Sequence, residues 1–93
     1  MPVINTAEKL ALQRLIEIAK RDTGQSRPVA SFLLSWWNAK TFGGFDPTDL
    51  WPLDEGIVAD ILLVLQLISK NTGKYPDAFE LSDEFEAIIA PHR

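Results

Sequence analysis

Five carboxylates in the middle of the chain come closest to the residue types and spacing of a metal site. They are Asp46, Asp49, Asp54, Glu55 and Asp60. Calcium loops place oxygen ligands at alternate positions before a glycine and a distant glutamate, and this spacing is not met here. Aspartate is also favoured at helix starts, which accounts for Asp46, Asp49 and Asp54 without a metal. We therefore expect no metal and no cofactor.

The residues available for nucleophilic or acid–base catalysis are few. His92 is the single histidine, and the chain has no cysteine. A Ser/His or Cys/His pair would have to be built on this next-to-last residue, which we expect to be solvated in a frayed terminus. Gly43-Gly44 lacks the lysine and the Ser/Thr of a phosphate-binding loop. We expect that the protein is not an enzyme and that it has no small-molecule substrate.

The net charge of −4 is distributed unevenly along the chain. Residues 1–45 carry six basic and three acidic groups, whereas residues 46–93 carry ten acidic and three basic groups. Either the two halves attract each other within one fold, or the acidic half forms a surface for a basic partner. The sequence pI of about 4.8 argues against direct binding to nucleic acid.

Hydrophobic residues recur at helical spacing through most of the chain, which predicts one all-α domain over residues 1–93. The expected fold is a small bundle of four helices, near residues 6–22, 27–40, 55–71 and 83–90, plus one short helical turn. Asn5 and Glu8 fit a capping box before the first helix, and Ser26 fits the cap of the second. Residues 74–81 are expected to be extended.

The short helical turn begins at Asp46-Pro47, because aspartate caps such turns and proline is favoured in their first position. Phe45 and Trp51 stand on either side of it. We expect both aromatic side chains to pack onto the core.

Six of the nine aromatic residues lie between Phe32 and Trp51. Neighbouring helical residues point about 100° apart, so Trp36 and Trp37 cannot both face the centre of one core. We expect Trp37 to be core and Trp36 to lie at an edge, stacked on Phe32 one turn earlier. Trp36, with Phe42 second, is a candidate partner-binding residue because tryptophan is enriched at interface hot spots.

The third expected helix is apolar nearly all round, which is typical of a central helix. Its main apolar stripe consists of Ile57, Val58, Ile61, Leu62, Val64, Leu65 and Ile68. Leu63 and Leu67 fall outside this stripe, between Asp60 and Lys70. We predict that they form an exposed patch that binds a partner, of which the simplest is a second copy of the chain.

The amino-terminal segment MPVINTAEKL has neither the basic nor the apolar stretch of a signal peptide. The most apolar run, residues 57–68, is shorter than the roughly 20 residues that a bilayer core requires. We expect a cytoplasmic protein that does not associate with membranes.

Three segments, GQSRPVASFLLSWWNA, GGFDPTDLW and YPDAF, resemble a family of small uncharacterised proteins from proteobacteria, often encoded on integrative elements and plasmids. The resemblance covers nearly the whole chain. It implies a bacterial accessory or mobile-element protein, and it implies no activity, cofactor or active-site residue. We expect a non-enzymatic protein-interaction module that binds another protein or a second copy of itself. The alternative is an acidic decoy whose residues 77–86 imitate nucleic acid and occupy a nucleic-acid-binding protein of the host.

Overall fold

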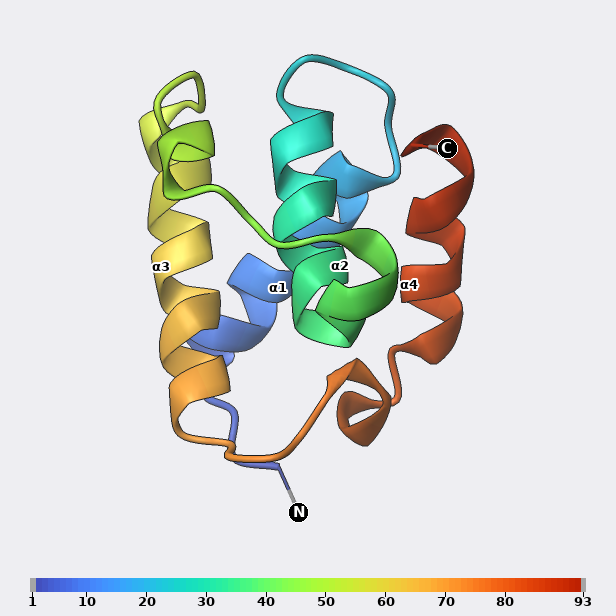
Figure 1. The fold of residues 1–93 in the computed structure, drawn as a ribbon. Coiled ribbons are helices and arrows are strands. Elements are labelled where there is room, and N and C mark those ends of the chain that lie inside the picture. The colour runs from blue at the N-terminus through green and yellow to red at the C-terminus, as the bar shows by residue number, and fades with distance from the viewer. Residues whose placement is uncertain (1, 93) are drawn as a thin grey trace.

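The all-α fold predicted from the sequence is confirmed by the computed structural model, which describes residues 2–92 (Figure 1). Within that range the chain forms four α-helices and three short 3-10 turns, and it forms no strand. In chain order the elements are α1 (Thr6–Ala19), α2 (Ser26–Phe42), η1 (Pro47–Leu50), α3 (Glu55–Ser69), η2 (Pro76–Phe79), α4 (Ser82–Ile89) and η3 (Ala90–His92).

Helix α1 begins at the capping box that the sequence predicted. The side chain of Asn5 accepts a hydrogen bond from the backbone N–H of Glu8 at 2.8 Å. In return, a carboxylate oxygen of Glu8 accepts one from the backbone N–H of Asn5 at 3.0 Å. Two of the backbone donors that a helix start leaves unpaired are thereby satisfied.

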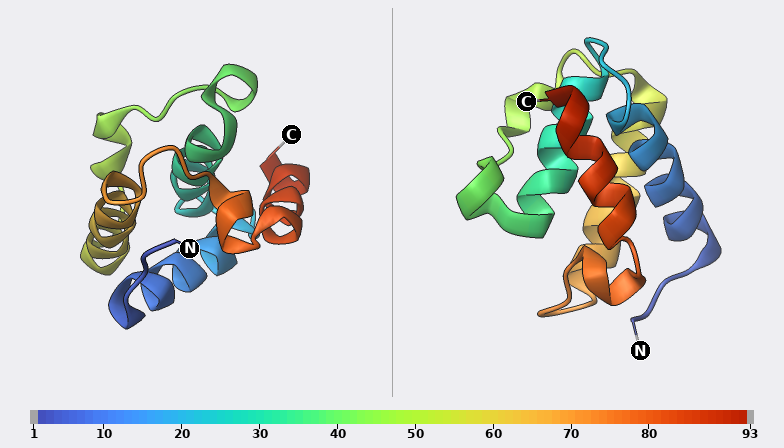
Figure 2. Two further views of the ribbon diagram at one scale, coloured as in Figure 1. Left: turned by 90° about the horizontal axis from the view of Figure 1, so that it is seen from below. Right: turned by 90° about the vertical axis from the view of Figure 1, so that its right-hand side faces the viewer.

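Helix α1 joins the other three helices. It packs along α3 and also contacts α2 and α4, as the view from below shows (Figure 2, left). The buried apolar residues form one cluster to which all four helices contribute: Ala11, Leu12, Leu15, Ile16, Ala19, Val29, Ala30, Phe32, Leu33, Leu34, Leu53, Ile61, Val64, Leu67, Phe85 and Ile88. The segment between α2 and α3 crosses the front of α2 in Figure 1, and the chain after α3 passes below the bundle to reach α4.

Ion pairs connect the basic and the acidic halves of the chain. The guanidinium of Arg14 donates to both carboxylate oxygens of Asp60, at 2.9 and 2.8 Å. Lys20 pairs with Glu84, which brings α1 and α4 together. These two contacts favour the interpretation in which the halves attract each other inside the fold.

Helix α2 changes direction at Asn38, whose backbone is not helical (φ −161°, ψ 89°). The Asn38 side chain accepts a hydrogen bond from the N–H of Thr41 at 3.2 Å and so caps the last turn of the helix. Because this turn is redirected, Phe42 stacks on Trp37, with ring centroids 5.7 Å apart and planes 25° apart. Gly43 then ends the helix with φ +89°, a conformation that favours glycine.

Several local predictions are wrong. Residues 74–81 are not extended throughout, because Pro76–Phe79 forms η2. Ser26 lies inside α2 rather than capping it, and its backbone N–H donates to the hydroxyl of Thr23 at 3.1 Å. His92 is half-buried rather than solvated, with Nε2 2.6 Å from the carbonyl oxygen of Ala19. Each difference depends on a contact that local sequence preference does not contain.

Among the helices of residues 2–92, none combines the length and the apolar character that crossing a membrane would require.

Candidate interaction surface

The rotation of α3 about its own axis differs from the one inferred from its sequence. Leu67 is fully buried and Leu63 is half-buried against the core. The prediction that these two leucines form an exposed patch is therefore wrong. Helix α1 covers this side of α3, as shown by the bidentate ion pair that joins Arg14 to Asp60.

Trp36 lies at an edge of the core, as predicted, but with different neighbours. Its indole packs edge-on against Phe79 at 5.7 Å and Phe85 at 6.0 Å, and not on Phe32. Its Nε1–H donates a hydrogen bond to the carbonyl oxygen of Lys74 at 3.3 Å. These contacts bind α2 to the segment that follows α3, so Trp36 has a role within the fold.

Trp37 is half-buried and not fully buried as a core residue would be. Its ring meets Phe85 edge-on at 5.9 Å and stacks on Phe42 on its other side. Phe42, the second candidate partner-binding residue, is therefore half-buried against Trp37. Phe85, which is fully buried and contacts both tryptophans, occupies the centre of this aromatic group.

Another side of α3 carries exposed apolar side chains. Leu62 is 57% exposed and Leu65 is 45% exposed, and Val58 is half-buried one turn before them. Residues spaced i, i+4 and i+7 lie on one face of a helix. Val58, Leu62 and Leu65 are called the α3 strip below.

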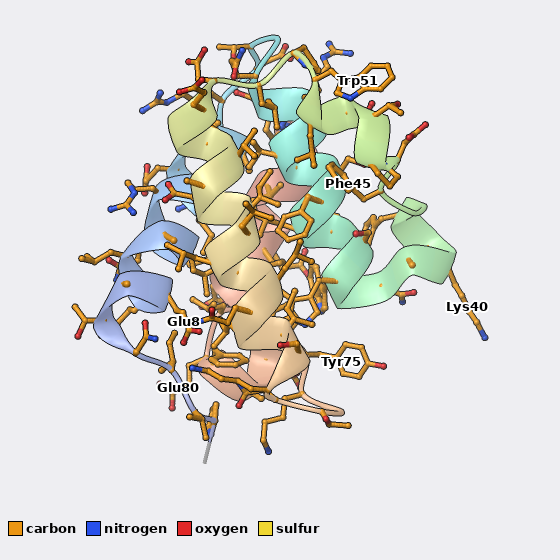
Figure 3. All side chains as sticks on the ribbon, turned by 90° about the vertical axis from the view of Figure 1, so that its left-hand side faces the viewer. Glu8, Lys40, Phe45, Trp51, Tyr75 and Glu80 are labelled. Carbon is orange, nitrogen blue, oxygen red and sulfur yellow. The ribbon has the colours of Figure 1, made fainter. Side chains whose placement is uncertain are left out.

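Two exposed aromatic residues lie at the ends of this strip. Trp51 is 83% exposed and Tyr75 is 55% exposed. Figure 3 shows both along the same edge of α3, Trp51 near its amino-terminal end and Tyr75 near its carboxyl-terminal end, with Phe45 between them. The α3 strip, Trp51 and Tyr75 together are called the α3 face. Leu62 and Leu65 on α3, and Trp51 and Tyr75 beside its two ends, are all exposed, and exposed apolar side chains gathered around one helix often mark a contact surface.

The exposure of Trp51 contradicts the prediction that it packs onto the core, although Phe45 does pack there, edge-on against Phe32 at 5.4 Å. Leu53 is the buried residue after η1. The side-chain amide of Gln25 fixes this backbone, because its nitrogen donates to the carbonyl of Pro52 and its oxygen accepts from the N–H of Asp54. The constraint holds the chain with Leu53 inward and Trp51 outward.

The sequence did contain a signal for the correct rotation of α3. Asp60 is a single carboxylate within an apolar run, and a charge on a covered helix side needs a partner. Arg14 on α1 is that partner. Taking Asp60 as the mark of the α1 side would have placed Leu67 inside and Leu62 outside.

A buried glutamate joins α1 to the carboxyl end of α3. Glu8 is fully buried, accepts a hydrogen bond from Gln66 Nε2 at 2.8 Å and pairs with Lys70 Nζ at 2.7 Å. Burial alone would raise the pKa of Glu8, but hydrogen bonds from the Asn5 backbone, Lys70 and Gln66 outweigh it, and the pKa lies below its ordinary value. Asn71 nearby binds the backbone of Val3, with bonds of 2.7 and 2.8 Å. The hydrogen bonds of Glu8 and Asn71 hold the segment before α1 against the carboxyl end of α3.

Two of the five carboxylates considered as a metal site, Asp46 and Asp60, have partners of their own. Within residues 2–92, no three potential metal-ligating side chains converge. Asp46 caps η1, and hydrogen bonds from the backbone and hydroxyl of Thr48 lower its pKa. Asp54 takes the cap position of α3, but its carboxylate makes no capping bond, contrary to the prediction. Asp60 pairs with Arg14.

A hollow of about 760 Å³ lies between the kinked end of α2 and η2, with Trp36, Trp37 and Asn38 on one side and Tyr75 on the other. Its titratable lining residues are Lys40, Tyr75 and Asp77. Among the described residues, none of these three side chains is hydrogen bonded to another.

Comparison with known proteins gives one match. The model of a family of unknown function (DUF7673) matches residues 9–93. No curated protein and no solved structure matches the chain significantly. Because the family model spans nearly the whole sequence, the chain belongs to this family of unknown function.

Proposed function

We propose that this protein is a non-enzymatic protein-interaction module that binds its partner through the α3 face. The observation that carries the proposal is the apolar surface formed by the α3 strip between Trp51 and Tyr75, whose exposed fractions are 83% and 55%. This surface replaces the patch of Trp36, Phe42, Leu63 and Leu67 that the sequence suggested.

The energetics favour a binding role for this surface. Fully burying a leucine side chain contributes about 1.5–3 kcal/mol, so Leu62 and Leu65 are a source of affinity that the fold leaves unused. Tryptophan and tyrosine are enriched among residues that dominate binding energy. Gln25 restrains the backbone after Trp51 through its hydrogen bonds to Pro52 and Asp54, and a restrained backbone loses less entropy on binding.

We further propose a cytoplasmic setting in a bacterial accessory or mobile-element system. This part of the proposal rests on the resemblance of residues 24–39, 43–51 and 75–79 to small proteobacterial proteins.

The double variant Leu62→Glu/Leu65→Glu is expected to lose the partner while keeping the fold. Two carboxylates on the α3 strip make its burial unfavourable, but both positions face solvent in the isolated molecule. Immobilised parent and variant are exposed to extract of a bacterial host, and bound proteins are quantified by mass spectrometry. We expect the proteins retained by the parent to be reduced at least tenfold on the variant.

Leu10→Glu is the matched control, because Leu10 is a leucine of similar exposure (46%) on α1. It should retain the same proteins as the parent. Far-UV circular dichroism checks that the double variant is still helical. Equal retention of every bound protein by the parent and the double variant would rule out the α3 face as the docking surface for those proteins.

The acidic-decoy alternative is supported by a different surface. Asp77, Glu80, Asp83 and Glu86 are exposed on η2 and α4, and none of them pairs with a cation among residues 2–92. Binding through these acids would weaken steeply as salt is raised, whereas binding through the apolar α3 face would change little. Repeating the capture at low and high salt distinguishes the two functions.

A further inference from the structure

Leu62 lies at the middle of α3 on its exposed side. Glu55 and Ser69 are both exposed, and each lies seven residues from Leu62, so the three fall on nearly one line along the helix. Trp51 precedes α3 and Tyr75 follows it, and both lie along one edge of the helix (Figure 3). In a two-fold interface the contact of residue i with j is repeated as j with i. At the centre of such an antiparallel pair, Leu62 would contact Leu62 of the second copy.

The charges at the two ends of α3 are opposite in sign. Asp54 and Glu55 lie at the start of the helix, and Lys70 and Lys74 follow its end. Lys70 is paired with Glu8 but retains a partly exposed side chain. Antiparallel pairing of two α3 helices places the acids of each copy near the lysines of the other. Parallel pairing would place like charges together, which is unfavourable.

The area of the α3 face suits a modest dimer interface. A stable interface buries about 800 Å² on each partner, which is about one-seventh of the 5635 Å² accessible surface of this molecule. Buried aromatic side chains cover about 150–250 Å² each. Trp51, Tyr75 and the α3 strip can supply about half of the required area, and a polar rim normally surrounds such an apolar centre.

From the central position of Leu62, the opposite charges at the ends of α3 and the area of the α3 face, we infer that its occupant is a second copy of this chain, bound antiparallel with Leu62 near the two-fold axis. This inference rests on the proposed function, because it names the partner of the same surface.

Single-cysteine cross-linking tests this arrangement, since the parent chain contains no cysteine and each variant would carry a single thiol. A disulfide requires a narrow geometry, with Cα atoms less than about 7 Å apart. A short bis-maleimide linker is therefore used. Leu62→Cys should cross-link to itself. A mixture of Glu55→Cys and Ser69→Cys should give the mixed 55–69 product, and neither should link efficiently alone.

The outcomes separate the alternatives. A parallel dimer would link 55 to 55 and 69 to 69, because the two positions are about 21 Å apart along one helix, and this result would overturn the antiparallel inference. Leu10→Cys on α1 is the control and should remain uncross-linked. Absence of every cross-link, together with a monomeric parent in sedimentation, would overturn the second copy as occupant. The proposed function would then stand or fall separately, by whether Leu62→Glu/Leu65→Glu loses foreign proteins in the capture experiment.

Discussion

Phe85→Ala is expected to lower the free energy of unfolding by about 3–5 kcal/mol, the usual cost of removing a buried aromatic ring. Phe85 is fully buried, and its ring contacts both Trp36 at 6.0 Å and Trp37 at 5.9 Å. Its loss leaves a cavity where α2 meets α4. Small domains have a total stability of about 5–15 kcal/mol, so this variant should be close to unfolded at moderate temperature.

Urea denaturation followed by tryptophan fluorescence measures this effect directly. Phe45→Ala is the matched control, because Phe45 is half-buried and packs at the edge of the core, against Phe32. Its destabilisation should be clearly smaller. If Phe45→Ala lowers the free energy of unfolding as much as Phe85→Ala does, Phe85 is not the centre of the aromatic group.

Glu8→Ala is expected to lower the free energy of unfolding by about 3 kcal/mol at neutral pH. The substitution removes the capping box of α1 and leaves the partly covered amine of Lys70 without its carboxylate. Breaking a buried ion pair by removing one member is strongly destabilising, and hydrogen bonds to charged groups contribute about 1.5–3 kcal/mol.

Glu17→Ala is the control, because Glu17 is exposed and lies 3.8 Å from Lys20. Such surface pairs contribute about 0–1 kcal/mol. Similar midpoints of denaturation for both variants would contradict a structural role of Glu8.

The same glutamate should make stability depend on acid pH. The pKa of Glu8 in the folded protein lies below its ordinary value of 4.5. The stability that it contributes is therefore fully present above 4.5, and it is lost as the pH falls through the folded-state pKa. In Glu8→Gln this contribution is absent at every pH. The stability difference between parent and Glu8→Gln should shrink as the pH is lowered below 4.5, and a constant difference would contradict the assignment.

The features predictable from the sequence were those decided within a few residues. The capping box of Asn5 and Glu8 and the turn that begins at Asp46 each depend on neighbours in the chain. Local propensity and capping therefore located all four helices and η1 correctly. The helix ends shifted by a few residues, as in α1, which ends at Ala19.

The features missed by the sequence reading depend on contacts between distant residues. The apolar stripe of α3 is so broad that its pattern does not define which side is buried, and the pairing of Asp60 with Arg14, 46 residues away, decides it. Trp36 is similarly bound to the carbonyl of Lys74, 38 residues away. Trp51 faces outward because Gln25, from the start of α2, holds the backbone that follows it. Hence local preference was enough to predict the helices, whereas predicting the exposed surface required the pairing of distant residues such as Asp60 and Arg14.

The most direct test of the α3 face as the binding surface is the molar mass of the parent and of Leu62→Glu/Leu65→Glu by light scattering. The chain mass is 10.4 kDa. We expect the parent and the Leu10→Glu control to show about twice this mass at high concentration. The double variant should remain helical and show the mass of a single chain. A parent with the single-chain mass at every concentration, or a double variant that keeps the double mass, would contradict antiparallel self-association through α3.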